Sequence, residues 1–278
     1  RVVYSVTEDC REIADITHPV VRTALENFSF RHGLEIHHDG DLPAASGIGS
    51  SSSFTVGILH ALYALRGEMT SKLELSRQAI RIEQHQLQEN VGCQDQIMAA
   101  YGGFNHIEIQ PSGEFLVHPL TLADYEEIST HSLLLFTGIR RLSSDVAGTY
   151  VNNLDARMEQ MTRVQQSVDI GKDLLLARGR MREFGELMHE SWLAKKSLSS
   201  AVTRPEIDAI YDAGREAGAI GGKILGAGGG GFMLLIVPPE RQKAVRERLR
   251  HLICVPFSFE NAGSQIIFYD PEKVENPI

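Results

Sequence analysis

The pattern of apolar and polar positions predicts that strands and helices are mixed along the whole chain. Strand-like patterns, either alternating or continuously apolar, occur near residues 2–7, 34–38, 104–109, 115–118, 132–136, 223–225, 232–237 and 264–269. Helical periodicity occurs near residues 50–66, 71–87, 143–178, 181–198, 204–217 and 240–251. Because no repeat or long linker separates these segments, we expect an α+β protein of two packed lobes. The predicted boundary lies near residues 121–131, and we expect the functional site between the lobes.

Composition excludes some classes of protein. The 278 residues are 42% hydrophobic and 23% charged, as in globular proteins with a substantial core. The net charge of -9 disfavours general nucleic-acid binding, which needs clustered basic residues. No apolar run approaches the ~20 residues of a membrane span, so no membrane association is expected. The spacing of Cys10, Cys93 and Cys254 fits neither a disulfide framework nor a zinc site, which favours a reducing cytoplasm.

The segment Pro43–Ser53, PAASGIGSSSS, is the clearest candidate for chemistry. Small residues let backbone N–H groups approach an anion, and the helix predicted to follow adds its free amides and positive dipole end. The segment differs from a Walker loop, because Gly49 and not lysine precedes Ser50. The charge that balances a phosphate must therefore come from a metal or from elsewhere. A serine-rich helix cap is the alternative interpretation.

A second glycine cluster, GAGGGG at Gly226–Gly231, formally matches GxGxxG. A dinucleotide-binding turn leads from a strand into a helix, whereas these glycines lead into the strand-like FMLLIV. Two interpretations stay open. The cluster is either a simple glycine hairpin or a place where the backbone closely approaches the phosphate loop or the substrate, and we favour the second.

Two acidic residues stand between the glycine clusters. Glu83 precedes Asp95 by twelve positions in IEQHQLQENVGCQDQ, and Gly92 interrupts the helical pattern between them. Phosphoryl transfer needs Mg²⁺ on the phosphates and a group that orients or deprotonates the attacking hydroxyl, so these two acids could divide the roles. A solvent-exposed helix position is the alternative for Glu83, and it is the expected one for Glu89.

These three motifs, in this order, resemble the GHMP kinase family over nearly the whole chain. Within the family, ADITHPVVRTALE, SGIGSSSSFTVG, GCQDQ and TGIRRLSSDVA are most similar to the bacterial kinases of D-glycero-D-manno-heptose 7-phosphate, which phosphorylate the C1 hydroxyl. The resemblance implies a two-lobed GHMP kinase fold. Residues 1–125 would form an N-terminal βα lobe that binds ATP and lacks its first strands. Residues 126–278 would form a ferredoxin-like C-terminal lobe with added helices.

The resemblance also implies roles for individual residues. Ser51 and Glu83 would hold Mg²⁺, and Asp95 would be the catalytic residue facing the acceptor hydroxyl, with its role as base or positioning group left open. Gln94, Asp95, Arg140, Lys196 and Gly229 would bind the sugar phosphate, although surface solubility is the alternative for each basic residue. ATP would contact Pro43, Ser46, Gly47, Ile48, Gly49, Ser50, Ser51, Ser52, Gly228 and Gly229.

One family motif has no counterpart. Its N-terminal strand and glycine-rich turn carry a basic residue, and Arg1 cannot be assigned to that position. We expect an N-terminal segment to be absent from this sequence, because every later motif is intact. The alternatives are a non-catalytic sugar- or nucleotide-binding regulator, and a kinase of an unphosphorylated sugar such as fucose or galactose. Whether the protein forms a homodimer stays open.

Overall fold

The computed structural model describes residues 1–30, 33–42, 46–140, 146–149 and 157–270. These residues form two compact units. The first comprises Arg1–Ala44, Gly49–Gly103 and Glu260–Ile278, and the second comprises Ala45–Ile48 and Phe104–Phe259. The units are defined by contacts within the chain, and the lobe boundary expected at residues 125/126 stays a prediction.

The first unit begins with a small sheet. Its central strand, β1 (Val2–Val3), pairs with β2 (Thr7–Glu8) in antiparallel and with β3 (Ile36–His37) in parallel orientation. A short 3-10 turn, η1 (Ile13–Asp15), leads to α1 (Pro19–Phe28). Pro19 is favourable at the first helical position because its missing N–H would have no intrahelical partner there. The sequence patterns did not predict α1.

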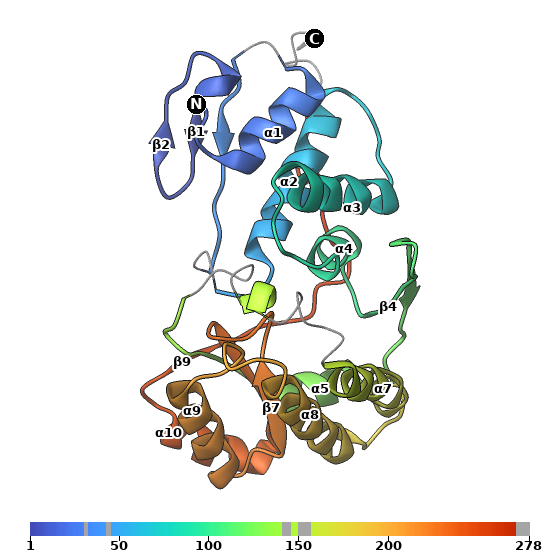
Figure 1. The fold of residues 1–278 in the computed structure, drawn as a ribbon, viewed down its shortest axis with the longest axis vertical. Helices are drawn as coiled ribbons and strands as arrows, with labels where there is room; N and C mark the ends of the chain where they lie inside the picture. Colours follow the sequence, from blue (N-terminus) through green and yellow to red (C-terminus); the bar gives the residue numbers. More distant parts are fainter. Residues whose placement is uncertain (31–32, 43–45, 141–145, 150–156, 271–278) are drawn as a thin grey trace. The chain divides into compact units, whose positions relative to one another are not determined.

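Three packed helices complete this unit (Figure 1): α2 (Ser50–Leu65), α3 (Lys72–Ile80) and α4 (Gln94–Tyr101). Prediction and structure agree closely for α2. The helix predicted over residues 71–87 is α3 followed directly by a π-helical segment, η2 (Arg81–Gln86). A core formed mainly by α1, α2 and α3, including Val21, Leu59 and Ile82, holds these helices together.

The second unit is built on a four-stranded antiparallel sheet with the order β7-β8-β6-β9. Its strands are β6 (Ser132–Phe136), β7 (Gly221–Ile224), β8 (Phe232–Ile236) and β9 (Ile253–Val255). A separate hairpin joins β4 (Asn105–Ile109) to β5 (Phe115–Pro119). The predicted strands at residues 104–109, 115–118, 132–136, 223–225 and 232–237 are therefore confirmed, with shifts of one or two residues at their ends.

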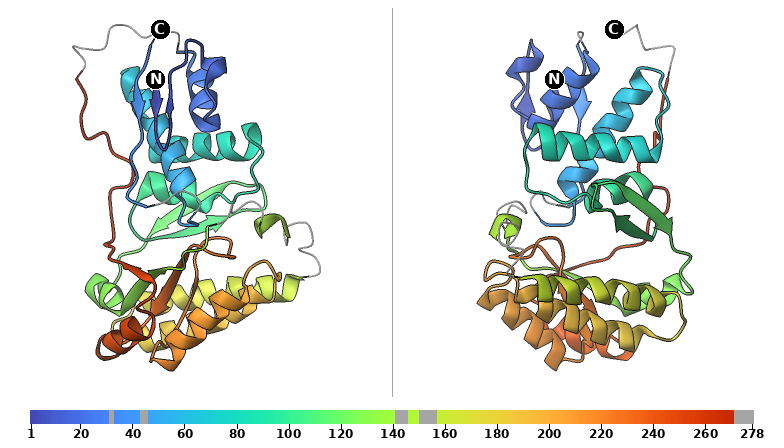
Figure 2. Two further views of the ribbon diagram at one scale, coloured as in Figure 1. Left: turned by 90° about the vertical axis from the view of Figure 1, so that its left-hand side faces the viewer. Right: turned by 45° about the vertical axis from the view of Figure 1, so that its right-hand side comes forward.

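The second unit also contains helices, of which α8 (Met181–Lys196) and α9 (Pro205–Glu216) pack against this sheet (Figure 2). Further helices are α5 (Tyr125–His131), α7 (Met158–Leu175) and, after the 3-10 turn η4 (Pro239–Arg241), α10 (Gln242–Arg248). Of the helical stretch predicted at residues 143–178, α7 is described, whereas residues 143–145 and 150–156 lie outside the described part. Buried Trp192, Ile207 and Leu235 belong to the core between the sheet and α8 and α9.

The strand predicted at residues 264–269 is wrong. Ser264 donates its N–H to the carbonyl of Ala99, and the residues that follow are extended without belonging to any described sheet. The apolar pattern marks an extended segment, but only a neighbouring strand can make it part of a ladder. Within the described ranges, no helix has the length and apolar character needed to cross a bilayer.

Candidate active site

The glycine-serine loop leads into α2 through left-handed backbone. Gly47 and Gly49 have φ of 77° and 76°, a region that glycine adopts without steric cost. No side chain caps the start of α2, and its first turn carries no acidic residue. The first amides of a helix lack intrahelical acceptors and lie at its positive end, so this turn suits an anion. Phosphate binding by Gly47–Ser52 stays a prediction, and Pro43 lies outside the described residues.

Glu83 is fully buried beside the first turn of α2. Ser52 Oγ donates a hydrogen bond of 2.9 Å to Glu83 Oε2, and Gln96 Nε2 donates one of 2.5 Å to the same oxygen. The other carboxylate oxygen, Glu83 Oε1, is buried and has no hydrogen-bond partner in the described part of the chain. The serine in contact with Glu83 is Ser52, whereas Ser51 is exposed. Metal binding by Ser51 stays a prediction.

The π-helical segment positions Glu83. Leu87 donates its N–H to the carbonyl of Ile82, five residues back, which is the hydrogen bond that widens a helix into a π-turn. Gln88 then adopts a left-handed φ of 55°, and the N–H of Glu89 bonds to the carbonyl of Glu83. Such turns are frequent at functional sites.

Glu89 was expected on a solvent-exposed helix face, and that expectation is wrong. Its side chain is half-buried because the turn at Gln88 brings the chain back to Glu83. Burial, and then the charge of Glu83, raise the pKa of Glu89 above its ordinary value. The structure therefore brings two carboxylates to this position.

The residues around Glu83 fit a divalent cation. Hard cations prefer carboxylate, hydroxyl and carbonyl oxygens, and a cation or an ordered water would satisfy a buried carboxylate oxygen that lacks a protein donor. No set of three or more His, Cys, Asp and Glu residues within the described part of the chain is arranged to hold a metal ion. A cation at Glu83 would therefore depend on hydroxyl, amide or phosphate oxygens as well as on carboxylates.

Asp95 lies in the first turn of α4, next to the start of α2. A Cβ added to Gly49 would lie 3.1 Å from Asp95 Cγ and 3.3 Å from Oδ2. Although much of the Asp95 side chain is exposed, the protein around its carboxyl displaces water and raises the pKa of Asp95. The neighbouring Gln94 is exposed. The roles predicted for Asp95 and Gln94 stay predictions, and the structure places Asp95 against Gly49 of the glycine-serine loop.

The second glycine cluster contacts the glycine-serine loop at Ser46, within the second unit. A Cβ on Gly231 would lie 2.0 Å from the carbonyl oxygen of Ser46. Thr137 donates from its N–H and its Oγ1 to the carbonyl of Gly231, at 2.9 and 2.7 Å, and Gly231 N–H donates to Ile139 at 2.8 Å. The favoured interpretation, close approach of this backbone to the loop, is confirmed at Gly231. Ser46 itself is fully buried, and its Oγ has no hydrogen-bond partner.

Gly228 and Gly229 of the same cluster pack against Val202. Gly229 donates its N–H to the carbonyl of Val202 at 2.8 Å, and a Cβ on Gly228 would lie 2.6 Å from that oxygen. These contacts explain why the run tolerates no side chain at residue 228. Contact of Gly228 and Gly229 with ATP or sugar stays a prediction.

The two basic side chains predicted to bind the sugar phosphate, Lys196 and Arg140, have different surroundings. Lys196 Nζ lies 2.6 Å from Asp208 and 6.0 Å from the centre of the Trp192 ring, whereas Arg140 is exposed in the loop after β6. Burial lowers the pKa of Lys223, which precedes the glycine run. Sugar-phosphate binding by Lys196 or Arg140 stays a prediction.

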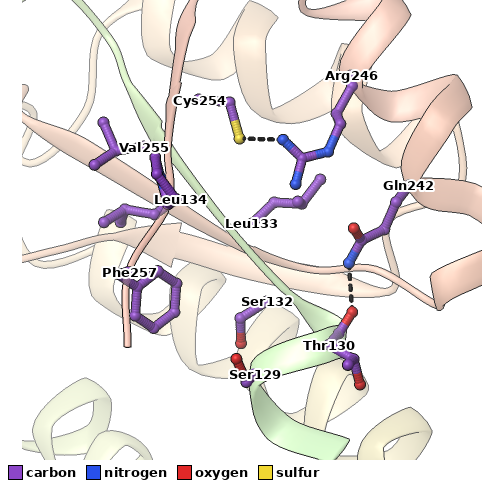
Figure 3. Close-up of a pocket in the computed structure, with 11 residues that line it drawn as sticks. Ser129, Thr130, Ser132, Leu133, Leu134, Gln242, Arg246, Cys254, Val255 and Phe257 are labelled. Carbon is purple, nitrogen blue, oxygen red and sulfur yellow. Dashed lines mark hydrogen bonds between the residues drawn. The ribbon is translucent and has the colours of Figure 1, made fainter. Parts of the chain in front are cut away.

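A cavity of about 150 Å³ lies elsewhere in the second unit (Figure 3). Its walls include apolar Leu133 and Phe257, and Arg246 Nη1 donates to Cys254 Sγ at 2.7 Å. Ser132, at its edge, pairs with Ile236, whereas the glycine run joins β8 at Phe232, the opposite end of that strand. The cavity therefore belongs to the far end of the sheet, and none of the predicted site residues lines it.

Sequence reasoning missed Gln96 and Glu89 as contributors to this site, and it assigned Ser52 to ATP without foreseeing its hydrogen bond to Glu83. Gln96 carried a usable signal, since it lies four residues before Ala100 on the buried face of α4. The turn that brings in Glu89 depends on a left-handed glutamine, which no glycine or proline announces in the sequence.

Comparison with known proteins identifies the family. The family model for the GHMP kinases N terminal domain matches residues 15–103, and the model for the GHMP kinases C terminal matches residues 174–253. The chain is 29% identical over 238 residues to the D-glycero-alpha-D-manno-heptose 7-phosphate kinase of Campylobacter jejuni, which covers 83% of this chain and 69% of that protein. It is also 29% identical to the L-fucokinase/L-fucose-1-P guanylyltransferase of Bacteroides fragilis, over 79% of this chain and 24% of that longer protein.

Solved structures agree with this assignment. A D-glycero-D-manno-heptose 1-phosphate kinase from Bacteroides thetaiotaomicron matches with a TM-score of 0.72 and 28% identity, over 91% of this chain and 74% of that one. A putative sugar kinase from Campylobacter jejuni matches with a TM-score of 0.70 and 28% identity, over 93% of this chain and 76% of that one. The predicted α+β fold is confirmed, and the chain belongs to the GHMP kinase family of phosphotransferases.

Proposed function

We propose that this protein is an ATP-dependent sugar kinase that phosphorylates the C1 hydroxyl of D-glycero-D-manno-heptose 7-phosphate. The observation that carries the proposal is the Asp95 carboxyl beside Gly49, at the amide-rich start of α2. An acceptor hydroxyl at Asp95 and phosphates at the first turn of α2 would be neighbours. Phosphoryl transfer between them needs mainly positioning and neutralisation of charge.

The first contribution of the chain is electrostatic. The free amides of the α2 first turn would bind phosphate oxygens, and the positive end of the helix would balance their charge. The left-handed Gly47 and Gly49 allow the backbone to approach the phosphates without a side chain between them.

The second contribution is the orientation of the attacking hydroxyl. The raised pKa of Asp95 makes this carboxylate more basic than an exposed aspartate, so it would accept a hydrogen bond or a proton from the sugar hydroxyl more readily. A bound divalent cation would neutralise charge on the β- and γ-phosphates. Glu83 would hold the cation through Oε1, with Ser52 and Gln96 fixing the other oxygen and Ser51 as the predicted hydroxyl ligand.

The heptose substrate is supported by similarity. The Campylobacter relative is named for a 7-phosphate and the Bacteroides structure for a 1-phosphate, so the position of the phosphate on substrate and product must be measured directly. The similarity to a fucokinase supports a second candidate, a kinase of a free sugar such as fucose. Arg140 and Lys196 remain our candidates for the phosphate of a phosphorylated sugar.

The test is MgATP-dependent phosphate transfer across a panel of sugars, with the product phosphates located by ³¹P NMR. D-glycero-D-manno-heptose 7-phosphate would be compared with free heptose, mannose, fucose and galactose. Strong preference for the heptose 7-phosphate, with new phosphate at C1, is the expected result. Preferential turnover of a free sugar would overturn the substrate and keep the kinase, and absence of turnover with every sugar would overturn both.

A further inference from the structure

Two unpaired buried oxygens lie on side chains that touch each other. Glu83 and Gln96 are both fully buried, and among the described residues neither Glu83 Oε1 nor Gln96 Oε1 has a hydrogen-bond partner. A buried acceptor without a donor costs about 1–3 kcal/mol, and more when it is charged. One cation, or one water that donates to both, would satisfy two such oxygens on adjoining side chains.

The orientation of the Gln96 amide follows from its neighbour. Its Nε2 donates to Glu83 Oε2 at 2.5 Å, and rotating the amide by 180° would place an oxygen against that carboxylate. The nitrogen must therefore face Glu83, which leaves Oε1 as the free acceptor. An amide oxygen has lone pairs and no proton to offer, so it can meet only a donor or a cation.

The hydrogen bonds that the Glu83 carboxylate accepts from the described residues all go to its second oxygen, Oε2. Ser52 Oγ and Gln96 Nε2 both donate to Glu83 Oε2, so neither bond serves Oε1. Magnesium and manganese are commonly held by one or two carboxylates, supplemented by other oxygens. We infer that Gln96 Oε1 is a protein ligand of a divalent cation bound at Glu83, in addition to holding Glu83 through its N–H.

This inference deepens the proposed function and rests on it only in assigning the cation to the nucleotide. Its test uses Mn²⁺ alone as the probe, without ATP or sugar, and follows the loss of the free-ion EPR signal. Wild type, Gln96→Met, Gln96→Glu and Glu83→Gln would be compared. Gln86→Met is the matched control, since it makes the same change at an exposed glutamine of the neighbouring π-helical segment.

The two Gln96 variants separate ligand from positioning residue. Methionine removes the oxygen and the N–H donor, whereas glutamate keeps an oxygen, replaces the donor by a second oxygen that faces Glu83, and adds a negative charge that attracts a cation. If Gln96 is a ligand, Gln96→Met should weaken Mn²⁺ binding by about tenfold or more. Gln96→Glu should then bind at least as tightly as wild type at pH 8, and Gln86→Met should be unchanged. Equal weakening in both Gln96 variants would reduce Gln96 to a positioning residue and overturn the inference.

Folding is monitored by circular dichroism and by melting temperatures without metal. If Gln96→Met does not fold, wild type labelled with ¹³C at the glutamine side-chain amides decides, because a ligating amide carbon couples to bound Mn²⁺. Absence of that coupling, or absence of saturable Mn²⁺ binding to wild type, overturns the inference. A kinase assay that fails while Mn²⁺ binding follows the expected order would overturn the proposed function and leave this inference standing.

Discussion

Ser52 Oγ lies 2.9 Å from Glu83 Oε2 and donates a hydrogen bond to it, although 31 residues separate the two in the chain. Ser51, one position earlier, is exposed. Adjacent serines of α2 therefore have different surroundings, one buried against a carboxylate and the other open to a ligand.

Ser52→Ala should destabilise the protein by about 1–3 kcal/mol, because a buried charged oxygen loses one of its two donors. Ser51→Ala should change stability by less than about 0.5 kcal/mol, as exposed substitutions usually do, and should raise the KM for MgATP. Urea unfolding and steady-state kinetics measure the two effects. A normal KM for MgATP in Ser51→Ala would remove Ser51 from the cation site.

Asp95→Asn should abolish most activity and stabilise the protein at neutral pH. The raised pKa means that folded Asp95 binds its proton more tightly than unfolded Asp95. The resulting stabilisation is present below the ordinary pKa of 3.8 and is lost as the pH rises through the folded value. Asparagine has no charge to desolvate, so the variant should melt higher than wild type at pH 7, with the difference shrinking toward pH 4.

The activity of Asp95→Asn should fall by about 10²–10⁴-fold in kcat, the usual contribution of a general base. Nucleotide binding, measured by calorimetry, should persist. Thermal unfolding across pH 4–8 tests the stability part independently of any substrate. A variant that melts lower than wild type at pH 7 would contradict the desolvation argument, and one with normal turnover would contradict the catalytic role.

Gly231→Ala should destabilise the protein more than Gly138→Ala. Both glycines have positive φ, 86° and 76°, so both variants carry a left-handed penalty of about 1–2 kcal/mol. An added Cβ at Gly231 would meet the Ser46 carbonyl oxygen at 2.0 Å, whereas at Gly138 no atom of the described residues lies within 4 Å. The difference in the free energy of unfolding between the two variants, measured in urea, should therefore report the steric overlap at Gly231 apart from the backbone strain that both variants share. Similar losses in the two variants would show that the loop moves aside.

The sequence predicted elements best where an apolar pattern was long or its ends were marked. The serines before Phe54 mark the start of α2, and the short continuous apolar runs of β6 and β8 give their positions within one residue. Sequence patterns did not predict β9 and α5, because these elements are too short to show a periodicity. They also did not reveal that η2 is π-helical, because one extra residue per turn barely disturbs helical periodicity.

The candidate site was predictable only in part. Glu83, Asp95 and the serine loop stand out by composition, since acids and glycines there have few structural uses. The contact between Ser52 and Glu83 depends on how α2 packs against the helices that follow it, and the half-burial of Glu89 depends on the φ of 55° at Gln88. Neither property is encoded locally. Sequence patterns thus indicate which residues carry chemistry, whereas packing determines which of them meet.

Gly49→Ala tests whether the loop controls the position of Asp95. Gly49 has a φ of 76°, and an added Cβ would lie 3.1 Å from Asp95 Cγ, tighter than ordinary contact. Gly67 is a matched control in the same unit, with a φ of 68° and only the Tyr269 hydroxyl near its added Cβ, at 3.9 Å. Both variants should lose about 1–2 kcal/mol of stability from the left-handed backbone.

Only Gly49→Ala should reduce kcat, because a shift of Asp95 by a few tenths of an ångström disturbs its alignment with the acceptor hydroxyl. We expect a fall of about tenfold or more in kcat for Gly49→Ala and less than about twofold for Gly67→Ala, measured on the sugar that the panel identifies. The comparison works because the stability loss is matched, so the difference in kcat reports on Asp95 alone. Equal kcat values in the two variants would mean that the loop and the carboxylate act independently.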